Sequence, residues 1–132
     1  MWLPDTNAWI GLINPRPSPV KERFQSHPPA SIFLGDVVKA ELYYGAFRSA
    51  RRDDNLALLE RIFQTFPSLA FDGAAARMFG EIRAVLAAVG TPIGPYDLQI
   101  SAIALVHGLT VVTHNTGEFN RVQRLRTEDW EI

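Results

Sequence analysis

Acidic side chains occur at separate points of the chain, each close to the expected end of a strand or beginning of a helix. Asp5 follows the short apolar run that opens the chain, and Asp97 lies in the first turn of a helix that Pro95 begins. Glu41 lies within the helix expected after the second strand, on its inward side with Gly45 one turn further on. A carboxylate there is costly unless it is paired, hydrogen-bonded or bound to a cation.

Each of these acids also has a purely structural explanation. Asp5 would cap the helix that follows it. Asp97 would gain roughly 0.3 to 1 kcal/mol from the helix dipole in a first turn. Glu41 would be a partly exposed glutamate in a helix that tolerates glutamate. Considered singly, none of these three residues shows whether its role is structural or catalytic.

The elements that position these side chains alternate along the chain. Strands are expected near residues 2–4, 31–34, 69–71 and 109–113, with a short edge strand near residue 126. Helices are expected at residues 6–13, 20–26, 37–50, 51–66 and 74–88, and from residue 95 onward. The two consecutive helices between residues 37 and 66 indicate a helical hairpin. This alternation predicts an α/β fold with a parallel sheet and right-handed crossovers.

In a parallel sheet all strands end at the same edge, so the acids are expected to meet there. A fourth polar position, Asn115 and Glu118, follows the strand at 109–113. Carboxylates that cluster repel one another unless a cation lies among them, and oxygen ligands without thiolates select Mg²⁺ or Mn²⁺. Phosphoryl transfer and phosphodiester cleavage use ions held in this way.

Composition narrows the class of protein further. The chain has 132 residues, 47% of them hydrophobic and 20% charged, which predicts one globular domain over residues 1–132. It contains no cysteine, so disulfides and thiolate ligands are excluded. No apolar stretch approaches the roughly 20 residues of a membrane span and no secretion signal is evident, so a cytoplasmic location is expected.

Charge does not mark the chain as a general nucleic-acid binder, because the net charge is −1. Arg48, Arg51 and Arg52 nevertheless cluster shortly after Glu41. They would either grip a phosphate backbone or form an ordinary solvated helix junction. His114, in the loop after the strand at 109–113, would either transfer protons or be a bystander, which is the commoner role of a lone loop histidine. Three aromatic residues would either pack in the core or stack on bases and partner surfaces, namely Trp9, Tyr43 and Tyr44.

Four motifs, spread over nearly the whole chain, resemble those of PIN-domain ribonucleases, and most of all the VapC toxins of VapBC toxin–antitoxin pairs. They are Leu3–Asn7, Val38–Gly45, Ile93–Ile100 and Val112–Phe119. The resemblance implies a three-layer fold in which helices flank a central parallel sheet of four to five strands. It implies a Mg²⁺- or Mn²⁺-dependent endoribonuclease whose metal is held by Asp5, Glu41 and Asp97, with Asn115 or Glu118 at the fourth acidic position. It also implies a homodimer, a VapB-type antitoxin that covers the site, and tRNA, notably initiator tRNA, or ribosomal RNA as substrate.

Two residues depart from the family pattern. Pro4 stands where an aliphatic strand residue is usual, which indicates an edge strand or a local irregularity. Asn115 stands where many members have aspartate, which favours a single bound metal.

Asn7 and Thr113 are expected to orient the metal-ligating side chains.

Two other functions remain open from the sequence. An aspartyl-phosphate hydrolase would use Asp5 as its nucleophile, but the acid/base position two residues on is Asn7. A catalytically degenerate domain that only binds nucleic acid or protein would gain nothing from three carboxylates where phosphate must approach.

Overall fold

Five short strands, all paired in parallel, form the centre of the computed structural model, which describes all of residues 1–132. One sheet has the order β1-β4-β5 and a second pairs β2 with β3. A single parallel bridge between Trp2 and Ile32 joins the two sheets. The strands are β1 (Trp2–Pro4), β2 (Leu34–Gly35), β3 (Ser68–Leu69), β4 (Thr110–Val112) and β5 (Thr127–Glu128).

Pro4 explains why the expected continuous sheet is divided. The Asp5 N–H donates to the Val112 carbonyl at 2.9 Å, whereas the Trp2 carbonyl accepts from the Phe33 N–H at 2.8 Å. Alternate residues of β1 therefore bond to opposite neighbours, and Pro4 lies on the side of β2. Because proline has no N–H, pairing on that side stops after the Trp2–Ile32 bridge. Of the two alternatives expected for Pro4, the local irregularity is the one observed, since β1 has neighbours on both sides.

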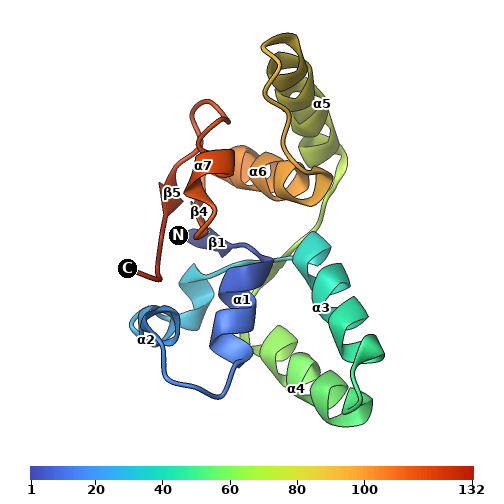
Figure 1. Cartoon of the computed structure of the whole chain (residues 1–132), viewed down its shortest axis with the longest axis vertical. Coiled ribbons are helices and arrows are strands. Elements are labelled where there is room, and N and C mark those ends of the chain that lie inside the picture. Colours follow the sequence, from blue (N-terminus) through green and yellow to red (C-terminus); the bar gives the residue numbers. More distant parts are fainter.

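Helices lie on both sides of the strands. Figure 1 shows α5, α6 and α7 above β1, β4 and β5, and α1 to α4 below them, with α3 and α4 forming the expected hairpin. The polar segment that follows β4 contains a short helix at Thr116–Phe119 and is not a loop throughout. None of the helices combines the length and the apolar character needed to cross a membrane. The helices are α1 (Thr6–Ile13), α2 (Pro19–Gln25), α3 (Asp36–Arg48), α4 (Arg52–Thr65), α5 (Gly73–Ala88), α6 (Pro95–His107) and α7 (Thr116–Phe119).

The largest hydrophobic core joins β1, β2 and β4 to α1, α3 and α6. Trp9 is fully buried there, with its ring centroid 4.9 Å from that of Phe24 and 4.8 Å from that of Phe66. A smaller core between α5 and α6 includes Ile82 and Leu98. Because α6 contributes to both cores, its first turn and Asp97 are held on a rigid element.

Candidate active site

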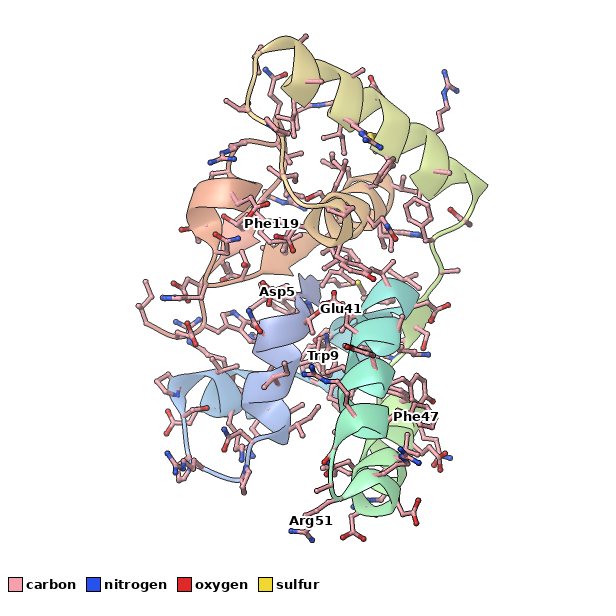
Figure 2. All side chains as sticks on the ribbon, turned by 45° about the vertical axis from the view of Figure 1, so that its right-hand side comes forward. Asp5, Trp9, Glu41, Phe47, Arg51 and Phe119 are labelled. Carbon is pink, nitrogen blue, oxygen red and sulfur yellow. The ribbon has the colours of Figure 1, made fainter.

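A cleft of about 620 Å³ lies where α1, α3 and the beginning of α6 converge. The three acids expected at the carboxyl edge of the strands, Asp5, Glu41 and Asp97, all line this cleft. In Figure 2, Asp5 at the start of α1 and Glu41 on α3 lie close together near the middle of the molecule. The other lining residues are Thr6, Asn7, Ile10, Ala40, Tyr44, Gly45, Arg48, Gly94, Pro95 and Tyr96.

Asp5 both caps a helix and lines the cleft, so the two explanations of this residue are not exclusive. Its Oδ1 accepts a hydrogen bond from the Ala8 N–H at 2.9 Å, which makes Asp5 the N-cap of α1. The side chain is 6% exposed. Burial raises the pKa of the Asp5 carboxyl above its usual value, while the Thr113 hydroxyl and the Ala8 N–H act in the opposite direction. Buried Thr113 thus supports the Asp5 carboxylate.

Glu41 is held from the neighbouring helix. The Thr6 hydroxyl of α1 donates to Glu41 Oε1 at 2.8 Å. Gly45, one turn along α3, has no heavy atom within 4 Å of the position that a Cβ would occupy. The Glu41 carboxylate is therefore fixed at one oxygen and has open space beside it.

Asp97 lies in the first turn of α6, at the position expected from Pro95. Burial, and then the negative charges of Glu118, Asp5 and Glu41, raise its pKa to about 6. The Asn115 side chain partly offsets this by hydrogen bonding to Asp97. The negative charges of the neighbouring acids thus disfavour the ionised form of Asp97.

Glu118, on α7, connects that helix to the start of α6 through a hydrogen bond. Its Oε1 accepts from the Gly94 N–H at 2.7 Å, and its Oε2 accepts from the Asn115 amide at 2.8 Å. The Gly94 bond is the largest cause of a lowered pKa for the Glu118 carboxyl, followed by the Asn115 bond. Since both oxygens are engaged, Glu118 positions Gly94 and the start of α6 from beside the cleft.

The remaining predicted residues divide between the cleft and its surroundings. Exposed Asn7 and Arg48 line the cleft. Arg51 and Arg52 do not; they line a separate hollow at the α3–α4 turn, and Figure 2 shows Arg51 far from Asp5. Arg51 pairs with Asp54 at 3.0 Å, and Arg52 donates to the Phe47 carbonyl. The structure therefore brings only Arg48 of this cluster to the acids.

An ion-paired cluster near Asp5 was not predicted from the sequence. His114 Nδ1 lies 2.9 Å from Asp129 Oδ2 and 2.8 Å from Glu131 Oε2. The hydrogen bond to Asp129 and the nearby carboxylates raise the pKa of the His114 imidazole. The order of the strands could have indicated this cluster. His114 follows β4 and Asp129 follows β5, and these two parallel strands are neighbours.

The charges in the cleft fit a hydrated divalent cation. None of the carboxylates of Asp5, Glu41 and Asp97 forms an ion pair with a basic side chain. The ligand oxygens of the three residues do not all lie within 4.8 Å of one another, so an ion bound among them would reach at least one carboxylate through its waters, several of which Mg²⁺ usually keeps. An all-oxygen donor set is also the one that Mg²⁺ and Mn²⁺ prefer.

Comparison with known proteins shows the family to which the chain belongs. The model of the family described as PIN domain matches residues 2–125. The chain is 44% identical over 126 residues to the tRNA(fMet)-specific endonuclease VapC of Shigella flexneri, covering 96% of this chain and 95% of the relative. It is 40% identical over 126 residues to the protein of the same name from Salmonella typhimurium, with the same two coverages. The crystal structure of DNA-bound VapBC from Salmonella typhimurium superposes with a TM-score of 0.90, covering 98% of this chain and 97% of that one at 40% identity.

The chain therefore belongs to the PIN-domain family and, within it, to the VapC ribonucleases, the toxins of VapBC toxin–antitoxin systems.

The Thr6–Glu41 hydrogen bond makes a first prediction about ribonuclease activity. Thr6→Val removes the hydroxyl that orients Glu41, and RNA cleavage is expected to fall about 10- to 100-fold, the usual effect of losing a group that orients a ligand. Thr6→Ser keeps the hydroxyl and should restore most of the rate. Initial rates of RNA cleavage and melting curves, measured in parallel, check this. Parental activity in Thr6→Val would show that the bond has no role in the site.

Glu118 gives a second prediction, which distinguishes a role in positioning the start of α6 from a role as a metal ligand. Glu118→Ala releases the Gly94 N–H, and cleavage is expected to fall about 10- to 100-fold as the start of α6 loosens. Glu118→Gln keeps a carbonyl oxygen for Gly94 and should recover most of the activity. If the glutamine variant is as impaired as the alanine variant, the charge of Glu118 is needed, and a role limited to positioning the start of α6 is wrong.

Proposed function

We propose that this chain is a Mg²⁺- or Mn²⁺-dependent endoribonuclease that hydrolyses a phosphodiester bond of tRNA, with initiator tRNA as the first candidate. The observation that carries the proposal is the cleft with three carboxylates and no ion-pair partner for any of them. The choice of tRNA is supported by the VapC relatives from Shigella flexneri and Salmonella typhimurium.

Asp5, Glu41 and Asp97 would hold the metal, directly or through its waters. When bound, the ion would supply a water molecule of lowered pKa for in-line attack on phosphorus and would offset negative charge on the phosphate oxygens. The chain's part is to hold the ligands still: the Ala8 N–H fixes Asp5, and the Thr6 hydroxyl fixes Glu41. With its pKa at about 6, the Asp97 carboxyl is predominantly ionised at neutral pH.

Arg48 and Asn7 would contact the RNA or the water around the ion. Arg48 is the only cationic side chain lining the cleft, so it is the side chain best placed to meet a phosphate there. Asn7 is exposed at the same wall, where its amide offers both a donor and an acceptor. Arg51 and Arg52 would contribute only if the RNA extended to the α3–α4 turn.

As partners we propose a VapB-type antitoxin that covers the cleft and a second copy of this chain in a homodimer. The VapBC structure from Salmonella typhimurium, which covers 98% of this chain, supports the antitoxin. Because the proposed substrate is tRNA, we propose a cytoplasmic location.

Cleavage of defined transcripts tests this function. Purified protein is incubated with initiator tRNA, an elongator tRNA and a ribosomal RNA fragment, in Mg²⁺, in Mn²⁺ and in EDTA, and the new RNA ends are sequenced. The expected result is one dominant cut in initiator tRNA that EDTA abolishes. A protein that binds tRNA but cleaves no RNA with either ion would instead be a binding module, and cleavage that persists in EDTA would exclude the metal mechanism.

A further inference from the structure

Two tyrosines on the rim of the cleft stand apart from the other aromatic residues. The side chains of Tyr44 and Tyr96 are 63% and 52% exposed, and both line the cleft. Trp9, by contrast, is fully buried, and half-buried Tyr43 packs its ring edge-on to Phe63 at 5.1 Å. Stability of the fold therefore does not account for the aromatic character of the two rim residues.

The position of each tyrosine in the chain places it beside an acid of the cleft. Tyr44 follows Glu41 by three residues on α3, so the two side chains share a helix face. Tyr96 immediately precedes Asp97 in the first turn of α6. The two rings thus approach the cleft from different elements, each next to a carboxylate of the candidate metal site.

Arg48 adds a constraint on the Tyr44 ring. The Arg48 guanidinium lies 5.0 Å from the centroid of that ring, within the range of a cation–π contact. Arg48 follows Tyr44 by four residues, so both remain on the same face of α3. One face of the ring is occupied in this way, while its high exposure leaves room for a planar group on the other face.

The charge of the cleft limits how RNA can bind there. Three carboxylates and a single arginine line it, so the phosphate backbone gains little net attraction before the metal is bound. Stacking of bases on neutral aromatic rings does not depend on charge, and it is available only to bases that are not already paired and stacked. Exposed tyrosines beside an acidic site are therefore suited to unpaired nucleotides.

We propose that Tyr44 and Tyr96 are stacking platforms that hold the unpaired bases on either side of the phosphate to be cleaved, with Arg48 orienting the Tyr44 ring. The proposal rests on the endoribonuclease function proposed above and adds the form of RNA that the cleft accepts. The two tyrosines are positioning residues: they fix the bases, and thereby the scissile phosphate, relative to the acids.

Kinetics of tRNA cleavage test the proposal with matched variants. Tyr44→Leu and Tyr96→Leu remove the aromatic face, whereas Tyr44→Phe and Tyr96→Phe keep it. Phe47→Leu is the control, because Phe47 is 54% exposed on the same helix but does not line the cleft. Each leucine variant is expected to lose about 5- to 100-fold in kcat/KM, mainly through a higher KM. The phenylalanine variants and the control should stay within about twofold of the parent.

A second measurement assigns each ring to one side of the cleaved bond. RNA carrying 2-aminopurine on one side or the other of that bond is bound with Ca²⁺ in place of Mg²⁺, and stacking is followed as quenching of fluorescence. Tyr44→Leu should relieve the quenching on one side and Tyr96→Leu on the other, while the shift in melting temperature caused by Mn²⁺ is unchanged in both.

Parental kcat/KM in both leucine variants would overturn the proposal, and so would an equal loss in Phe47→Leu. Leucine variants that cleave normally but bind a VapB-type antitoxin weakly would show that the rim serves the protein partner instead. Failure of the proposed function looks different, because the parent protein itself would then cleave no RNA.

Discussion

Replacing Asp97 by asparagine is expected to reduce RNA cleavage by at least about 10²- to 10³-fold, the range seen when one group that stabilises transition-state charge is removed. The reason is that Asp97 supplies one of the three carboxylates of the cleft, and its amide replacement carries no charge for a divalent ion. Cleavage rates in saturating Mg²⁺ measure the loss. Asp53→Asn, at an exposed position on α4 outside the cleft, is the matched control and should retain full activity.

Asp97→Asn should not destabilise the fold, because burial and neighbouring negative charges already disfavour the Asp97 carboxylate in the metal-free protein. Its pKa in the folded state, about 6, lies above the value of about 4 in an unfolded chain. The folded state therefore binds more protons, so the free energy of unfolding of the parent should fall as the pH rises from about 4 to about 6. Asp97→Asn should flatten this slope and melt no lower than the parent in EDTA at pH 8. A variant that melts well below the parent there would mean that its inactivity reflects damage to the fold.

Addition of Mn²⁺ to metal-free protein is expected to raise the melting temperature by several degrees. A ligand that binds only the folded state at 100 times its dissociation constant stabilises it by about 2.7 kcal/mol. Here the bound ion would also relieve the repulsion among Asp5, Glu41 and Asp97. Thermal melting over a series of Mn²⁺ concentrations measures the effect, and EDTA should reverse it.

The variants separate this stabilisation from weak binding elsewhere on the surface. Asp5→Asn and Asp97→Asn should lose most of the Mn²⁺ shift, whereas His114→Ala, in the exposed cluster with Asp129 and Glu131, should keep it. The dependence on pH has a definite sign: protons compete with the metal at Asp97, so the Mn²⁺ shift should grow as the pH rises through about 6. A shift that survives in both asparagine variants would place the ion outside the cleft.

Much of this site was predictable from local sequence patterns, because its residues lie at the ends of elements. Pro95 as the first residue of α6 placed Asp97 in the first turn, and the apolar run before Asp5 placed that residue at the end of β1. The parallel arrangement of the strands was predicted from their alternation with helices and is confirmed. That these ends meet in one cleft then followed from the common direction of the strands.

The parts that were not predicted depend on contacts between distant segments. Pro4 signalled an irregularity, but only the pairing of Trp2 with Ile32 showed that it divides the expected sheet. The spacing of Arg51 and Arg52 did not reveal that the turn after α3 carries them away from the acids. The sequence pattern also did not distinguish Tyr43, which packs on Phe63, from Tyr44, which faces the cleft. One residue along a helix is a rotation of about 100°, so small changes in register decide such outcomes.

The most direct measurement is the anomalous scattering of crystals grown with Mn²⁺. A strong anomalous peak among the carboxylates of Asp5, Glu41 and Asp97, absent from crystals of Asp97→Asn, is the expected result. A parent crystal whose only manganese lies elsewhere, or whose cleft binds none at a concentration that supports cleavage, would contradict the assignment of these three residues as the metal site.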